Sequence, residues 1–274
     1  MRANHNALFA MRSISSPLRK AFRFFLISYY ENKAQYQQTR LGLAWIPASS
    51  TFFVLVLTGV FAHIQSMSAV DYFLYVLSGY CAWMLILETI NQSTSTIQGQ
   101  LDFANHNRVS MVELFIKNVV DRLFRHMLNI GTLYGILLVL AVAGDVRWAD
   151  IARSLLLYPI VLAFALPTAL GTSYIVNSVS LVWPDLEKVI HTSTRFLFFL
   201  SPVFWIYNAG ETGFRQLLVT WNPVVYWLDV TRQAFGLNEL DIRSWIVVAM
   251  NMIAVCAIAM FVYRRNAGII RNIS

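Results

Sequence analysis

Charged residues are scarce in this sequence, and their scarcity excludes a large class of proteins. Only 13% of the 274 residues are Asp, Glu, Lys or Arg, whereas 57% are hydrophobic. Soluble domains usually carry about 25% charged residues, so we exclude a water-soluble globule. Cysteine is also scarce: the chain has two, Cys81 and Cys256, and both lie in apolar runs. A disulfide framework or a cysteine-rich metal site is therefore not expected.

Signatures of nucleotide, metal and hydrolase sites are missing as well. No Gly is followed by Lys, so the phosphate-binding loop G-x-x-x-x-G-K-[ST] is absent. Neither H-E-x-x-H nor H-x-x-x-x-D occurs. The five histidines lack the spacing of metal ligands; they are His5, His63, His106, His126 and His191. We expect no catalytic, cofactor-binding or metal-binding residue in this chain.

Long apolar runs are what the sequence does contain. A helix needs about 20 apolar residues to cross the hydrocarbon core of a membrane. Six segments meet this requirement, at about 41–64, 72–90, 127–143, 155–183, 189–205 and 245–263. We therefore predict an all-α integral membrane protein with six transmembrane helices. It would have an N-terminal region 1–40, a membrane domain 41–263 and a tail 264–274.

The basic residues predict the orientation of these helices. Sixteen Lys and Arg would lie on the side of the two chain ends, against five on the other side. Because cytoplasmic loops are rich in Lys and Arg, both ends are predicted to be cytoplasmic. The five outer residues are Arg147, Arg153, Arg215, Arg232 and Arg243. The net charge of +7 thus indicates membrane orientation rather than nucleic-acid binding, and we expect no cleaved signal peptide in the basic first 40 residues.

An amphipathic segment precedes the first span. Ser16 can cap a helix and Pro17 fits its first turn. Apolar residues then recur at helical spacing, with basic residues on another face, up to Lys33. This pattern favours a helix lying in the cytoplasmic interface of the membrane. A plain leader into the first span is the alternative.

Two other segments are too short or too polar to cross. Ser110 and Glu113 have capping-box spacing, which predicts a helix that continues into the third span. The preceding stretch 98–107 is either a solvated loop or a docking element for a cytoplasmic partner. Between 206 and 244, two apolar patches are separated by Asn222-Pro223. We predict a pair of short interfacial or re-entrant helices there, on the outer side, bordering a cavity.

Hydroxyl, amide and aromatic residues occur near the ends of two spans. The second span continues as residues 91–96, and the fifth carries Thr192 to Thr194 among several aromatics. Such a mixture is typical of a path for a long polar chain such as a glycan. A lipid-facing aromatic belt is the alternative. Glu88 is predicted near the inner boundary of the second span, too far from the midplane for a proton relay.

Three stretches of the sequence are similar to a known family. They are 39–47 (TRLGLAWIP), 183–189 (WPDLEKV) with 195–204 (RFLFFLSPVF), and 221–226 (WNPVVY) with 231–236 (TRQAFG). In order and spacing they resemble the permease subunit of type-2 ABC exporters, in the branch that exports capsular polysaccharide and O-antigen. The WPDLEK stretch is closer to the capsule permeases.

The resemblance implies a homodimer above two copies of an ATP-binding cassette subunit, which would hold the ATP and magnesium. The substrate would be a lipid-linked polysaccharide that leaves the cytoplasm across the inner membrane toward periplasmic or outer-membrane export proteins. The coupling segment 98–107 would contact the ATPase through Asp102, Phe103, Asn105 and His106. The interface helix would use Arg19, Phe22, Arg23 and Phe25. Asn222, Pro223 and Arg232 would belong to external gating helices at 211–237, and Trp45, Phe52, Phe199, Trp205 and Tyr207 are candidates for the polymer path.

Two other functions remain open at this point. A secondary transporter or channel without an ATPase would carry ionisable residues near the midplane or repeated halves. A membrane glycosyl- or acyltransferase would carry clustered carboxylates or a His–Asp arrangement at one membrane face. Neither feature is clear in the sequence.

Overall fold

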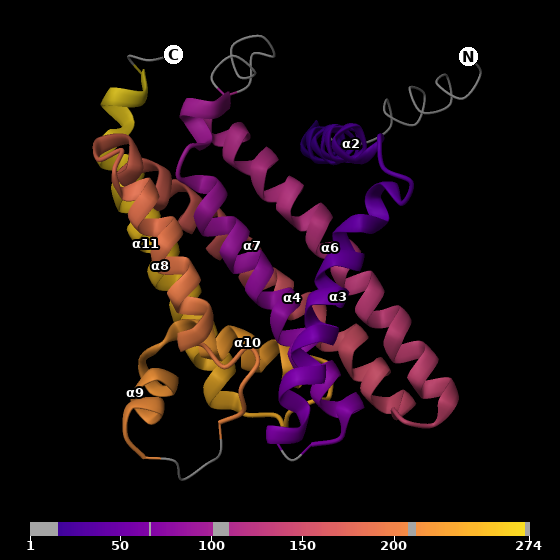
Figure 1. Cartoon of the computed structure of the whole chain (residues 1–274). Helices are drawn as coiled ribbons and strands as arrows, with labels where there is room; N and C mark the ends of the chain where they lie inside the picture. Colours follow the sequence, from indigo (N-terminus) through magenta and orange to yellow (C-terminus); the bar gives the residue numbers. More distant parts are fainter. Residues whose placement is uncertain (1–15, 66, 101–109, 208–211, 272–274) are drawn as a thin grey trace, which may run out of the picture.

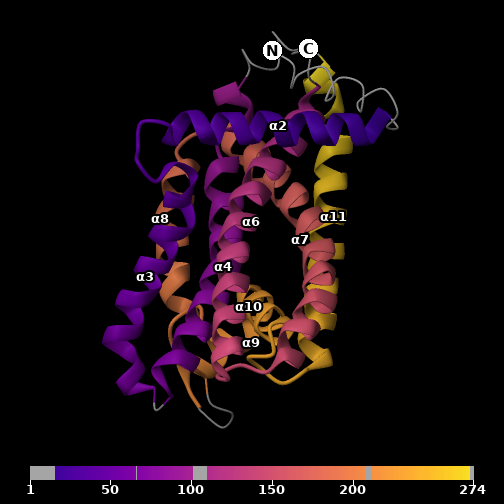
Figure 2. The ribbon, with the colours of Figure 1, turned by 90° about the vertical axis from the view of Figure 1, so that its right-hand side faces the viewer.

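The computed structural model describes residues 16–65, 67–100, 110–207 and 212–271. Helices make up the described ranges, which contain no strand. They form a bundle with one helix lying across its end (Figures 1 and 2). The elements are α2 (Ser16–Tyr36), η1 (Gly42–Ala44), α3 (Trp45–Phe61), η2 (Ala62–Ile64), α4 (Ala69–Ser93), α6 (Met111–Ala143), α7 (Trp148–Val182), α8 (Leu186–Leu200), α9 (Phe214–Trp221), α10 (Pro223–Ala234) and α11 (Ile242–Arg271).

Five helical stretches in the described residues are long and apolar enough to cross a membrane. They are Gly42–Ile64, Ala69–Ser93, Met111–Ala143, Trp148–Val182 and Ile242–Arg265. These stretches correspond to five of the six predicted spans. The described residues are therefore those of a helical membrane protein, as the sequence predicts.

The predicted span at 189–205 is not confirmed as one helix. In its place α8 has 15 residues and ends at Leu200. At about 1.5 Å per residue this helix is about 22 Å long, shorter than the hydrocarbon core of about 30 Å. Ser201 has the extended backbone that a following proline favours, with ψ 143°. Pro202 thus ends the helix, and residues 201–207 continue without regular structure.

The start of α6 confirms the predicted capping box. The Ser110 hydroxyl accepts from the Glu113 amide, and the Glu113 carboxylate accepts from the Ser110 amide. The helix then runs for 33 residues, well beyond the predicted third span, and ends at Gly144 in the left-handed conformation with φ 93°. It therefore carries the basic residues Lys117, Arg122 and Arg125, which belong to a helix rather than to a loop.

The predicted interface helix is present as α2. In Figure 2 it lies across one end of the bundle, roughly perpendicular to the long helices. We call this the α2 end, and the carboxyl end of α11 lies there too. Phe25 and Tyr29 pack edge-on against Phe124 of α6, with ring centroids 5.6 and 6.2 Å apart. Phe22 and Arg23 are exposed, and the side chain of Arg19 lies outside the described part.

The core surrounds α4, which is the most buried of the long helices. Its Tyr72 to Leu77 stretch packs with residues of α6, α7 and α10. The two predicted short helices are present as α9 and α10 and differ in burial. None of the residues of α9 is buried, whereas α10 is buried over most of its length and lies against α4, α7 and α11. We call the end of the bundle that holds α10 the α10 end (Figure 1).

Candidate functional site

At the α2 end, α4 stops and the chain continues toward the predicted coupling segment. The last turn of α4 and residues 94–98 carry hydroxyl and amide groups that face α6 and α7. The predicted coupling residues Asp102, Phe103, Asn105 and His106 lie outside the described residues. The structure therefore describes the residues that precede this segment, and they belong to a network of buried polar side chains.

Arg122 of α6 is at the centre of this network. Its side chain is buried, with 1% exposed. Nη1 donates to Ser173 Oγ of α7 at 2.6 Å, and Nη2 donates to Ser93 Oγ of α4 at 3.0 Å. Because a buried cation is costly unless it is hydrogen-bonded, these contacts fix the three helices relative to one another.

Amide side chains hold the chain as it leaves α4. Asn177 of α7 donates to the Thr94 carbonyl at 3.3 Å and to Gln98 Oε1 at 3.0 Å. Asn118 of α6 donates to Thr96 Oγ1 at 3.4 Å. The residues at the start of the predicted coupling segment are therefore hydrogen-bonded to α6 and to α7.

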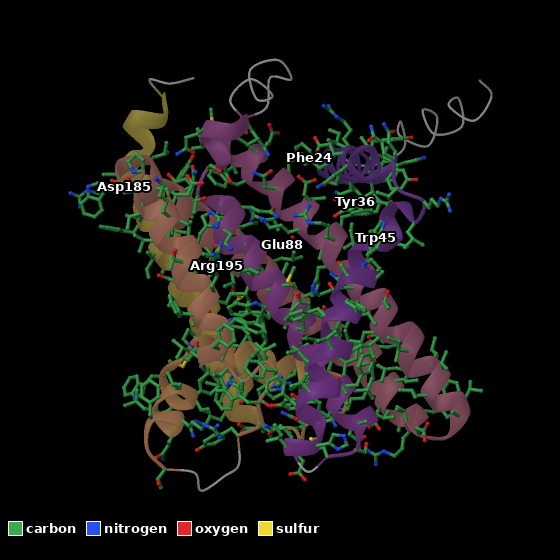
Figure 3. All side chains as sticks on the ribbon, in the orientation of Figure 1. Phe24, Tyr36, Trp45, Glu88, Asp185 and Arg195 are labelled. Atoms are coloured by element: carbon green, nitrogen blue, oxygen red, sulfur yellow. The ribbon has the colours of Figure 1, made fainter. Side chains whose placement is uncertain are left out.

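Ion pairs extend the network to α2 and along α4. The Lys117 ammonium, only 4% exposed, lies 2.6 Å from Glu31 of α2 and 2.8 Å from Asp121 of its own helix. Glu88 of α4 pairs with Arg125 of α6 at 2.9 Å. In Figure 3 Glu88 points into the half of the bundle nearer α2. It holds two helices together, as a packing residue does.

Residues 91–96 at the end of the second span, predicted as part of a polymer path, differ in exposure. Gln92 is exposed, whereas Ser93, Thr94 and Thr96 are buried. Their partners lie on α6 and α7, and those partners cannot be read from the periodicity of α4 alone. Sequence reasoning missed Arg122 and Asn177, although an arginine within a long apolar helix was the available signal.

The predicted gating residues form a second cluster, at the α10 end. Arg232 is one of the five basic residues assigned to the outer side, yet it is buried, with 2% exposed. Its Nη2 donates to the carbonyls of Pro202 and Val203 at 2.8 and 3.1 Å, and Nε donates to the Tyr75 carbonyl at 3.2 Å. The guanidinium lies 3.5 Å from the centre of the Tyr75 ring. Gly79 leaves room for it, because a Cβ there would lie 2.4 Å from Nη2.

Asn222 and Pro223 complete the attachment of this segment. Asn222 Oδ1 accepts from the Val224 amide and so caps α10, while Pro223 occupies the first turn. Asn222 Nδ2 donates to Ser201 Oγ at 2.8 Å. The irregular segment after α8 is therefore attached to α10 at Ser201 as well as at Pro202 and Val203. We call Arg232, Asn222 and the segment 201–205 the α10 latch.

The predicted path aromatics do not share one environment. Phe52 and Phe199 are 70% and 63% exposed, and Trp45 is exposed near α2 (Figure 3). Trp205 is buried, and its Nε1 donates to the Phe199 carbonyl at 3.1 Å. Tyr207 is half-buried. Phe52 and Phe199 are thus open to a ligand or to lipid, whereas Trp205 packs inside the chain.

Both clusters consist of groups that hold helices in position rather than groups that bind a metal. Among the described residues, no three His, Cys, Asp or Glu side chains are grouped to hold a metal ion. The groups present are serine hydroxyls, amides, arginines and paired carboxylates, and most of them contact a neighbouring helix. Such contacts fix the helices relative to one another.

Comparison with known proteins identifies relatives of one kind. The O-antigen export system permease protein RfbA of Myxococcus xanthus is 23% identical over 207 residues, which cover 74% of this chain and 77% of the relative. A protein of the same name from Klebsiella pneumoniae is 17% identical over 86% of this chain and 89% of the relative. A second one from that species is 17% identical over 75% and 78%. No family model matches the sequence. With the five long apolar helices, these relatives confirm the predicted resemblance: the chain is a multi-pass protein of the bacterial inner membrane, similar to the permease subunits of type-2 ABC exporters.

Proposed function

We propose that this chain is the membrane subunit of an ATP-driven exporter that moves a lipid-linked polysaccharide out of the cytoplasm. The observation that carries the proposal is the similarity to O-antigen export permeases over 74% to 86% of this chain and 77% to 89% of the relatives. ATP hydrolysis would belong to a separate subunit, because this chain lacks a phosphate-binding loop.

The proposed substrate is an O-antigen-type polysaccharide. The WPDLEK stretch favours a capsular polymer, whereas all three relatives carry O-antigen export in their names. The relatives match most of the chain and the stretch covers six residues, so we give the relatives more weight. Capsule export is the second candidate within the same mechanism.

The proposed topology has six crossings with both chain ends in the cytoplasm. The fifth crossing in chain order, which is missing from the five long helices, would be α8 extended by the irregular residues 201–207. Backbone without helical hydrogen bonds is tolerated at membrane depth where protein groups satisfy it. The α10 latch supports this topology, because Arg232 and Asn222 supply such groups to the segment after α8.

Coupling would run from the segment 98–107 into the bundle through the network at the α2 end. The attachment of Thr94, Thr96 and Gln98 to α6 and α7 supports this direction. A force on the coupling segment would then move α4, α6 and α7 as a unit. In the proposed homodimer, the exposed aromatics Phe52 and Phe199 would face the polymer path between the two copies.

The test is co-purification of the full chain from its own membranes, followed by an export assay. We expect a protein with a phosphate-binding loop to co-purify. We expect the Phe103→Asp variant to lose most of that partner, because a charge replaces an apolar anchor, and Phe103→Leu to keep it. Transport by vesicles that hold this chain alone would refute the proposal and favour a secondary transporter. Unchanged association of Phe103→Asp would refute the coupling role.

A further inference from the structure

A cavity of about 220 Å³ lies inside the bundle, between the two clusters. Its wall comes from α4, α6, α7, α10 and α11. The α7 part runs from Tyr158 to Thr172, which is the middle of a helix that extends from Trp148 to Val182. The lining segments of α4 and α11 also lie within candidate membrane spans. The cavity is therefore at hydrocarbon depth.

The wall of this cavity is mostly hydrocarbon. Its polar groups are largely turned to partners within the bundle: Thr168 Oγ1 donates to the Phe164 carbonyl at 2.8 Å, and Asn251 Oδ1 accepts from Trp227 Nε1 at 3.2 Å. Two of the lining residues also carry a buried atom without a hydrogen-bond partner, Thr89 Oγ1 and His126 Nδ1. An engineered apolar cavity of about 150 Å³ stays dry and admits benzene. This larger cavity is suited to a hydrocarbon ligand.

Alanine side chains leave space for the cavity, and larger lining residues beside them are partly exposed. Ala82, Ala165 and Ala169 are buried in its wall, whereas Ile86 and Leu162 are partly exposed. The cavity is partly open, and a ligand that passes Ile86 and Leu162 would meet apolar side chains.

We propose that this cavity binds one acyl chain of a membrane phospholipid. Acyl chains are the solvent at this depth, and a cavity without a ligand forfeits the dispersion contacts of its wall. Val224, Trp227 and Thr231 of α10 form part of the wall, so the bound chain supports the helix that carries the α10 latch. The inference goes beyond the proposed function, because it does not depend on which polymer is moved.

The test uses the full chain in lipid nanodiscs with a phospholipid that carries a photoreactive group on its acyl chain. We expect adducts on lining residues of α4, α7 or α10. Filling the space with Ala165→Phe or Ala169→Phe should lower this labelling at least fivefold. Ala163→Phe is the matched control, since Ala163 is exposed on the same helix, and it should label as the wild type does. Circular dichroism and gel filtration select the variants that fold.

Three results would overturn the inference. The first is a wild-type protein with no adduct on the lining residues, which is decisive even where neither filled variant folds. The second is equal labelling of Ala163→Phe and the filled variants. The third is displacement of the label by a polyprenyl phosphate at concentrations where added phospholipid has no effect, which would assign the cavity to an isoprenoid carrier instead.

Discussion

Replacing Arg232 by Met tests whether the α10 latch holds the bundle together. The change removes hydrogen bonds to the carbonyls of Pro202, Val203 and Tyr75 and a contact 3.5 Å from the Tyr75 ring. A buried carbonyl left without a partner costs about 1–3 kcal/mol, and a desolvated cation–π contact contributes about 2 kcal/mol. Relief of the buried charge offsets part of this loss. We expect the free energy of unfolding to fall by about 2–4 kcal/mol.

Gly79 offers an independent test that leaves Arg232 in place. A Cβ at Gly79 would lie 2.4 Å from Arg232 Nη2, whereas a Cβ at Gly135, also within a helix, meets nothing within 4 Å. Ala is a better helix former than Gly by about 1 kcal/mol, so Gly135→Ala should stabilise the protein. Gly79→Ala should destabilise it, because the methyl group displaces the guanidinium from its carbonyl partners.

The assay for both is a denaturant titration of the purified full chain in detergent, followed by tryptophan fluorescence. The ordering expected is Gly135→Ala, wild type, Gly79→Ala and Arg232→Met, from most to least stable. The reasoning would be refuted if Arg232→Met unfolded at the wild-type denaturant concentration. It would also be refuted if Gly79→Ala stabilised the protein as much as Gly135→Ala.

Three further predictions concern the α2 end and the exposed aromatics. Glu31→Gln should weaken the hold of α6 on α2, seen as faster trypsin cleavage after Lys33; unchanged cleavage would contradict a role for the 2.6 Å ion pair with Lys117. A double-mutant cycle of Glu88→Gln and Arg125→Met should give a coupling of about 1–2 kcal/mol in the unfolding assay, whereas purely additive losses would show that the pair is not coupled. Phe52→Ala should leave stability within about 0.5 kcal/mol of the wild type, since the ring is 70% exposed, and should slow export if it faces the polymer; a large loss of stability would make it a packing residue.

Features encoded by neighbouring residues could be predicted from the sequence. The start of α6 follows from Ser110 and Glu113, whose reciprocal hydrogen bonds require only that the two residues lie three positions apart. The start of α10 follows in the same way from Asn222 and Pro223. The long spans follow from hydropathy, because the membrane imposes one length requirement on all of them.

Features that depend on a distant partner could not be predicted. Arg232 reads as an outer loop cation, but its partners are backbone carbonyls, which every residue carries and no motif marks. Ser93 reads as part of a polar path, but it accepts from Arg122 of another helix. The end of α8 is a different case. Pro202 stands in the sequence and restricts the residue before it, whereas the hydropathy of 189–205 favours one continuous span.

The latch has a consequence for how the α10 end of the molecule can move. Hydrogen bonds from the Arg232 guanidinium join the segment 201–205 to α10. The capping residue Asn222 joins the same two segments through Ser201. We therefore expect a displacement of either segment to displace the other, and the same guanidinium also holds both to Tyr75 of α4. A motion that widens this end would therefore have to move α10 and the segment 201–205 together, or break the hydrogen bonds of the buried Arg232 guanidinium.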